Sequence, residues 1–186
     1  MTKRGTTGVS PRTQKRNTTT KPRANLRAKQ SFTLEVAILS GPMTERFARK
    51  HPVISRTIAI RGDQTLAHLH RTIFNAFDRD DEHLYEFQIG GSRLMDPNAR
   101  RYGPPMASVH PFDEGERSAD SERTTLNVLG LATGDVFAYW FDFGDDWWHQ
   151  IAVLTITENA PRGKLPVVTK RVGKSPPQYV DWDEEA

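Results

Sequence analysis

The side chains best suited to chemistry lie on one short aromatic segment: Asp142, Asp145, Asp146 and His149. Carboxylate oxygens and imidazole nitrogens bind hard or borderline divalent metal ions, and a carboxylate–histidine pair can act as a general base. His83 would join the group if its strand lies beside this segment. Asp142, Asp145 and His149 are therefore candidate metal ligands of a hydrolase or nuclease.

The same residues also have a structural interpretation, because Asp and Gly are common in tight turns. In this interpretation Asp142 and Asp145 cap backbone donors of a turn at Gly144. His149 packs beside a neighbouring tryptophan and donates one hydrogen bond. The spacing matches neither the EF-hand calcium loop nor the H-E-x-x-H motif of zinc proteases. We favour this interpretation, which predicts no bound metal and no cofactor.

Other catalytic signatures are missing from the sequence. It contains no G-x-S-x-G or S-x-x-K nucleophile motif and no G-x-x-x-x-G-K-[ST] phosphate loop. The string Asp142-Phe143-Gly144 matches the magnesium motif of protein kinases, but the kinase Gly-rich loop, strand lysine and H-R-D element are missing. The chain has no cysteine, which excludes thiolate catalysis, disulfides and cysteine-bound zinc. The sequence favours a protein that is not an enzyme.

Charge is distributed unevenly along the 186 residues. The chain has 26 basic and 23 acidic side chains; residues 1–30 hold nine of the basic ones and no acidic one, which leaves 31–186 with a net charge of −6. Contact with a polyanion is therefore expected from residues 1–30 rather than from the folded part. These residues carry few apolar side chains, which predicts a disordered basic tail.

The tail has two interpretations. As a phosphate-binding arm it would make weak, non-specific, salt-sensitive contacts with DNA through its basic side chains: Arg12, Lys15, Arg16, Lys21, Arg23, Arg27 and Lys29. As a solubilising leader, an extension from an early start codon or a transit peptide, it would bind no nucleic acid. Single-strand binders stack bases on aromatic residues, which the tail lacks, so the second interpretation is favoured.

Periodic apolar residues predict the secondary structure. Alternation predicts strands, the first two antiparallel, near residues 32–39, 53–60 and 84–89. Helical spacing predicts one amphipathic helix from Leu66 to Phe77, capped by Asp63 or Thr65 and lying on a sheet. His70 falls on its apolar stripe, where we expect a packed histidine with one hydrogen bond.

The aromatic segment predicts a hairpin, with strands over 136–143 and 147–157 and a turn at Gly144-Asp145-Asp146. Alternation places three aromatic side chains on one face and Trp140 on the other: Tyr139, Phe141 and Phe143. Either the helix covers one face and the C-terminal segment the other, or one face stays open as a partner surface.

The remaining segments complete a three-part organisation. Residues 90–124 form a long Gly- and Pro-rich loop, either functional or disordered, and 125–131 an apolar turn that returns to the core. We therefore expect a disordered basic tail over 1–30, one α+β domain over 31–159, and a partly ordered C-terminal extension over 160–186. The extension either wraps the domain through Tyr179 and Trp182 or extends into solvent.

Three motifs in order resemble the plasmid pRi ORF-three-like family. Residues 139–149 resemble its Y-x-Y-D-F-G-D-x-W-x-H signature, with Phe141 in place of the second Tyr. The predicted helix resembles T-L-x-x-L-H-x-x-I-x-x-A-F, and residues 83–87 resemble H-L-x-x-F. Arg79 stands where the family often has Trp. The resemblance covers about residues 31–159 and implies an α+β roll, in which a twisted, mostly antiparallel sheet packs on one main helix.

The resemblance also implies an uncharacterised protein associated with plasmids or transposons. We therefore expect a non-enzymatic binding or accessory protein with an unknown protein or nucleic-acid partner; its association with mobile DNA elements rests on the resemblance alone. No run approaches the roughly 20 apolar residues of a membrane span, so a cytoplasmic, intracellular protein is expected. The alternative is a metal-dependent hydrolase or nuclease that uses the carboxylates and histidine of residues 142–149.

Overall fold

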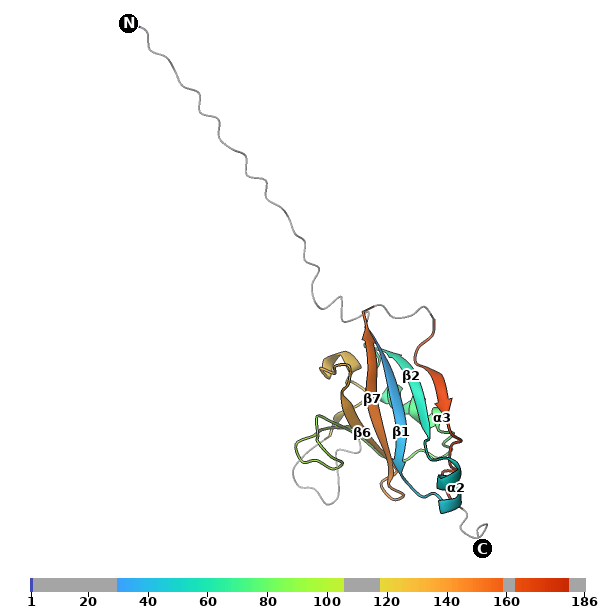
Figure 1. The fold of residues 1–186 in the computed structure, drawn as a ribbon. Coiled ribbons are helices and arrows are strands. Elements are labelled where there is room, and N and C mark those ends of the chain that lie inside the picture. The colour runs from blue at the N-terminus through green and yellow to red at the C-terminus, as the bar shows by residue number, and fades with distance from the viewer. Residues whose placement is uncertain (2–29, 106–117, 159–162, 181–186) are drawn as a thin grey trace.

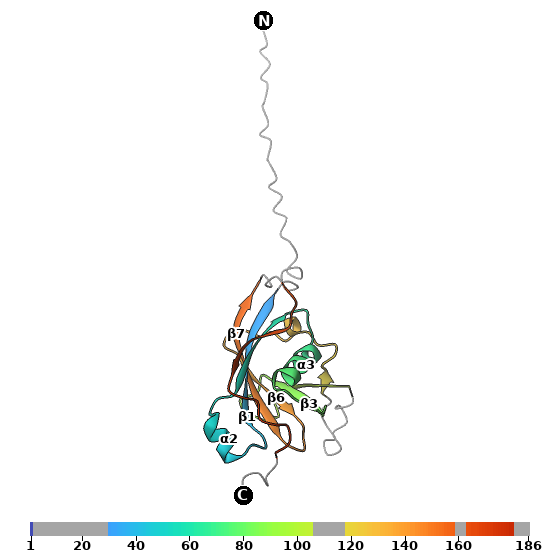
Figure 2. The ribbon, with the colours of Figure 1, turned by 90° about the vertical axis from the view of Figure 1, so that its right-hand side faces the viewer.

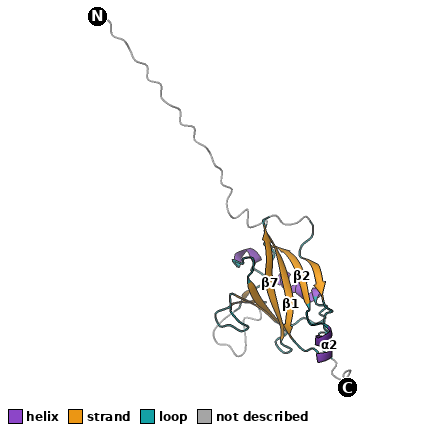
Figure 3. Ribbon diagram, viewed as in Figure 1, coloured by secondary structure: helices purple, strands orange, loops and turns teal. Residues whose placement is uncertain are grey.

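The computed structural model describes Met1 and residues 30–105, 118–158 and 163–180. Within this part, eight strands form one sheet in the order β5-β4-β3-β6-β7-β1-β2-β8 (Figure 1). Neighbouring strands are antiparallel except β4 and β5, which are parallel. The predicted α+β class is confirmed, with a large mixed sheet and few helices (Figure 3). Nearly all of the predicted tail lies outside the described residues.

The predicted strands form the middle of the sheet. They are β1 (Ser31–Ser40), β2 (Ser55–Arg61), β3 (Tyr85–Ile89), β6 (Val136–Phe141) and β7 (Trp147–Thr157). β1 and β2 are antiparallel, as predicted, and β6 and β7 form the predicted hairpin. Alternating apolar residues therefore identified the strands whose side chains build the core.

Three strands at the two ends of the sheet were not predicted. The long loop contains β4 (Arg100–Gly103) and β5 (Ala119–Asp120), and residues 106–117 between them lie outside the described part. At the opposite end, β8 (Val167–Val172) pairs with β2. Residues beyond 159 thus contribute a strand to the same sheet.

The longest described helix is α3 (Leu66–Ala76), and the Thr65 side chain accepts the His68 backbone N–H at its start, as predicted. Figure 2 shows α3 beside the sheet. Its buried side chains share one apolar cluster with the strands, and Leu126 of the 3-10 turn η1 (Leu126–Val128) joins them. A six-residue helix, α2 (Glu45–Lys50), connects β1 to β2. No described helix has the length and apolarity to cross a membrane.

A smaller aromatic cluster is separate from this core. Trp140 stacks on Trp148 with ring centroids 4.8 Å apart, and Phe143 stacks on Trp140 at 4.1 Å. Phe143 therefore groups with Trp140, and its predicted place beside Tyr139 was wrong. The alternation ends because β6 stops at Phe141 and Asp142 has a φ of 55°.

Arg56 is a charged side chain at the centre of the packing between three segments. Only 2% of it is exposed. Its Nε donates to the Ala76 carbonyl at 2.8 Å, Nη1 donates to the Val172 carbonyl at 2.9 Å, and Nη2 donates to Ser175 Oγ at 2.7 Å. Arg56 thereby joins β2 to the end of α3 and to the segment after β8.

Candidate functional site

The predicted polar cluster begins at Asp142, which organises the hairpin turn. Its Oδ1 accepts the backbone N–H groups of Gly144 at 3.1 Å and Asp145 at 3.3 Å. Its own N–H donates to the Leu84 carbonyl at 3.0 Å. His83 Nε2 lies 3.4 Å from Asp142 Oδ2, so the structure does bring these two residues together. Asp142 is buried and engaged with backbone donors, as the structural interpretation predicts.

Asp146 and His149 do not join Asp142, and no described residue pairs with the Asp145 carboxylate as a cap would require. Asp146 is exposed and accepts the Trp140 indole N–H at 2.9 Å, on the side of the smaller aromatic cluster. His149 is 1% exposed, and its ring lies 5.2 Å from the rings of Tyr139 and Phe77. Within the described residues, no three His, Asp or Glu side chains are grouped as metal ligands would be.

His149 differs from its predicted environment. Neither ring nitrogen has a hydrogen bond of ordinary geometry within the described residues. The backbone carbonyls of Trp147 and Tyr139 are close enough to raise the pKa, but burial and then Arg79 outweigh them, lowering it from 6.5 to about 3. The imidazole is therefore neutral and interior at physiological pH. This environment suits packing better than metal binding or proton transfer.

His70 fulfils its prediction as a packed histidine. Its Nδ1 lies 2.8 Å from the Tyr139 hydroxyl, and its ring stacks on Tyr85 at 3.6 Å. The Tyr85 hydroxyl continues the network to Ser121 Oγ at 2.8 Å. Burial, followed by the nearby charge of Arg71, lowers the His70 pKa from 6.5 to about 3.

Acid should destabilise the fold through these two histidines. Above the unfolded-state pKa both states are neutral; below it the unfolded chain binds protons that the folded chain does not, so stability falls as pH falls from 6.5 toward 3. Between pH 7 and 5.5 the pair should cost about 2–3 kcal/mol. Replacing His149 with leucine should remove about half of this cost, as measured by urea unfolding at both pH values.

The exposed His68 provides the control for this measurement. His68→Gln should keep the full acid sensitivity, because it changes an exposed side chain and leaves both buried histidines in place. An equal pH dependence in the parent and the His149→Leu variant would show that His149 is not held neutral in the interior.

Arg79 is a second buried charge near the hairpin. Its guanidinium lies over the Trp147 ring, 3.8 Å from the centroid, so an aromatic contact forms where the family often has Trp. Nη1 donates to the Pro176 carbonyl at 3.4 Å, whereas Nε and Nη2 have no partner within the described residues. Burial is the main cause that lowers its pKa from 12.5 to about 10, which leaves it charged.

The C-terminal segment, residues 173–180, lies against the residues between α3 and β3. Gln178 Oε1 accepts the backbone N–H groups of Asp80 at 2.8 Å and Asp81 at 3.0 Å, and its Nε2 donates to the Asp81 carbonyl. The Tyr179 hydroxyl lies 3.0 Å from His83 Nε2. Of the two predicted wrapping residues, Tyr179 therefore contacts the domain, and Trp182 lies outside the described residues.

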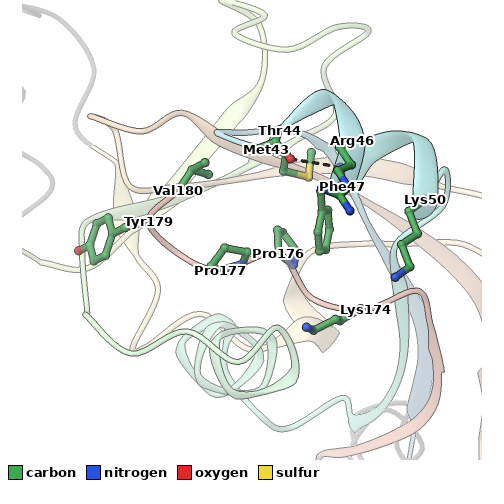
Figure 4. A pocket seen from close by; sticks show the side chains of 10 residues that line it. All are labelled: Met43, Thr44, Arg46, Phe47, Lys50, Lys174, Pro176, Pro177, Tyr179 and Val180. Atoms are coloured by element: carbon green, nitrogen blue, oxygen red, sulfur yellow. Dashed lines mark hydrogen bonds between the residues drawn. The ribbon is translucent and has the colours of Figure 1, made fainter. Parts of the chain in front are cut away.

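A groove of about 470 Å³ lies between α2 and this C-terminal segment (Figure 4). Phe47 extends from α2 toward Pro176. Lys50, from α2, and Lys174, from the C-terminal segment, both lie at one end of the groove. The lining is apolar, aromatic and basic, with no acidic residue: Met43, Thr44, Arg46, Phe47, Lys50, Lys174, Pro176, Pro177, Tyr179 and Val180. Its composition suits a ligand that combines an apolar part with negative charge.

Sequence reasoning did not find this groove. Two local signals existed: the Thr44 cap followed by Glu45 and a basic end predicts a short helix, and Lys174 belongs to a basic stretch. Neither signal indicates that the two segments meet. The predicted nucleic-acid contacts of the tail, from Arg12 to Lys29, lie outside the described residues.

Comparisons with known proteins fit this architecture. The chain is 30% identical over 132 residues to the uncharacterized protein y4hQ of Sinorhizobium fredii; the match covers 69% of this chain and 60% of that relative. A crystal structure of protein of unknown function MM3350 from Methanosarcina mazei Go1 matches with a TM-score of 0.61 and 20% identity, covering 81% of this chain and 74% of that one. This second likeness concerns the fold alone.

The family model described as plasmid pRiA4b ORF-3-like protein matches residues 46–182. This range contains the hairpin signature, α3, the residues around His83 and the groove lining except Met43 and Thr44. The predicted resemblance is confirmed, and the chain belongs to the plasmid pRiA4b ORF-3-like family; the match runs beyond the predicted end at residue 159 to residue 182.

Proposed function

We propose that this protein is a non-enzymatic binding or accessory protein whose ligand site is the groove between α2 and the C-terminal segment. The supporting observation is the groove itself. At about 470 Å³ it falls within the range of roughly 300–1,000 Å³ typical of small-ligand sites. Arg46, Lys50 and Lys174 give it positive charge, and Met43 and Phe47 give it an apolar wall. The proposed ligand is therefore anionic with an apolar or aromatic part.

The alternative, a metal-dependent hydrolase or nuclease, lacks comparable support. Its candidate ligands Asp142, Asp145 and His149 do not converge, because the His149 ring packs against Tyr139 and Phe77. Asp142 Oδ1 is already engaged by two backbone N–H groups. The geometry thus favours binding over metal catalysis.

Finer parts of the expected function are also proposals. We propose that the sheet and α3 form a roll, which the shared apolar cluster supports. A role with mobile DNA elements is supported by the plasmid named in the family description. A cytoplasmic location is likewise a proposal from the sequence, as is an unknown protein or nucleic-acid partner.

The groove is tested with anilinonaphthalene sulfonate, an aromatic anion whose fluorescence rises on binding. The dye should bind the full chain saturably, and the double variant Lys50→Glu/Lys174→Glu should weaken binding at least about tenfold. Both lysines lie at one end of the groove, so charge reversal places carboxylates where the sulfonate would bind.

Lys170→Glu is the matched control, because Lys170 is an exposed lysine of β8 outside the groove lining. It should leave dye affinity within about twofold of the parent. Equal dye binding by the parent and the double variant would contradict the proposed site.

We also propose that any weak DNA contact of this chain is made by residues 1–30 rather than by the net acidic remainder. Replacing the seven named basic residues, Arg12 to Lys29, with glutamine should make the slope of log K against log salt less negative by as much as about 6. The thermal transition should not shift, since these substitutions lie outside the domain. The measurement is fluorescence anisotropy with labelled duplex DNA at several salt concentrations; an unchanged slope would assign the contact elsewhere.

A further inference from the structure

We infer that the groove recognises an acidic, aromatic peptide, and that residues 181–186 of this chain are its built-in occupant. This inference rests on the proposed binding groove. The sequence over 181–186 is Asp-Trp-Asp-Glu-Glu-Ala, with four carboxylates and one indole in six residues. It matches the two chemical features of the groove, positive charge and an apolar wall.

The position of the chain supports this occupant. Val180 is the last described residue before the segment, and it lines the groove. Gln178 and Tyr179 hold the preceding residues against the domain through hydrogen bonds to the Asp81 backbone and to His83. The segment therefore starts from a fixed point at the groove, and six residues can span at most about 20 Å.

Charge and shape define how the segment would bind. Figure 4 places Val180 and Tyr179 at one end of the groove and Lys50 and Lys174 at the other. A chain running from Val180 along the groove brings Glu184 and Glu185 toward the two lysines. The Trp182 indole would then pack against Phe47 and Pro176, which lie between these two ends in Figure 4.

Tethering makes a weak contact sufficient. A segment joined directly to its site has an effective concentration in the millimolar range, so an intrinsic affinity of about 0.1 mM would keep the groove mostly occupied. An external ligand would have to compete, and its apparent affinity would fall about tenfold. The groove would thus be selective for acidic peptides that bind better than its own segment.

The test compares full-length chains with the same dye. In the neutralised variant, Asp181, Asp183, Glu184 and Glu185 are replaced by their amides and Trp182 by alanine. This variant should bind the dye about tenfold more tightly than the parent, and a synthetic Asp-Trp-Asp-Glu-Glu-Ala peptide should displace the dye. Asp63→Asn/Glu122→Gln, which neutralises exposed carboxylates outside the groove lining, is the matched control and should leave dye affinity unchanged.

The outcomes separate the two proposals. If Lys50→Glu/Lys174→Glu lowers dye affinity but the neutralised variant binds the dye like the parent, the groove is a binding site and residues 181–186 do not occupy it. If the double charge reversal has no effect on dye binding in the neutralised variant, where no acidic segment competes, both proposals fail. A parent affinity that rises to the neutralised value on dilution would mean that the segment occupies a second copy, which overturns the assignment to its own groove.

Discussion

Replacing Arg56 with alanine should lower the free energy of unfolding by about 4 kcal/mol or more. The side chain is 2% exposed, and it donates to carbonyls of Ser55, Ala76 and Val172 and to the hydroxyl of Ser175. Truncation leaves these acceptors without the donor and removes a cation from the face of Phe77, whose centroid lies 4.8 Å away. Because typical domains are stable by only about 5–15 kcal/mol, the loss should be evident in urea unfolding.

Arg171→Ala is the matched control for this experiment. Arg171 also donates to the Ala76 carbonyl, but its side chain is exposed on β8. Its removal should cost no more than about 1 kcal/mol, in the range of an ordinary hydrogen bond. If Arg56→Ala were as mild as Arg171→Ala, the buried guanidinium would not join β2, α3 and the C-terminal segment energetically.

Replacing Trp147 with alanine should cost about 3–5 kcal/mol. The indole is fully buried, and Arg79 lies over its ring at 3.8 Å. The backbone at Gly41 packs directly against the ring, because a Cβ added there would lie 2.2 Å from a ring carbon. The variant loses the packing of the ring and also leaves a buried cation without its aromatic partner. Equilibrium urea unfolding at pH 7 measures the loss.

Two further variants separate the contribution of a ring beneath Arg79 from the general cost of removing a tryptophan of the hairpin. Trp147→Phe keeps a ring beneath Arg79 and should cost less than half as much as alanine. Trp140→Ala, in the smaller cluster on the other side, should also cost less, because this ring remains 8% exposed. A change below about 1 kcal/mol for Trp147→Ala would contradict a structural role for the hairpin signature.

The sequence predicted the elements whose burial is periodic. The apolar stripe on α3 and the alternation along β6 and β7 follow the spacing of side chains that face one core. The turn could also be predicted, because Asp142 caps backbone donors within its own segment. Such local relationships can be read from the order of residues alone.

Other features depend on distant segments. β8 lies at one end of the sheet with mostly exposed side chains, so it lacks the apolar alternation of an inner strand. Arg56 and Arg79 are buried although charged residues usually lie at the surface, and their acceptors include Val172 and Pro176 far along the chain. Nothing in the sequence around either arginine identifies these partners.

The candidate sites show the same division. His149 is near the aspartates in sequence, but as a residue of β7 it faces Tyr139 and Phe77 rather than the turn. The groove has the opposite property, since Lys50 and Lys174 are 124 positions apart and lie at one end of one cavity. Proximity in sequence therefore suggested a metal site, whereas the chain fold creates the groove.

Mapping dye binding by nuclear magnetic resonance on the full isotope-labelled chain tests the central claim that binding occurs at the groove and the hairpin is structural. With anilinonaphthalene sulfonate, amide shifts should concentrate in residues 43–50 and 174–180, with the turn at 142–146 unchanged. Added magnesium or zinc should move neither set. Shifts centred on Asp142, Asp145 and Asp146, with either the dye or the metal, would contradict the account.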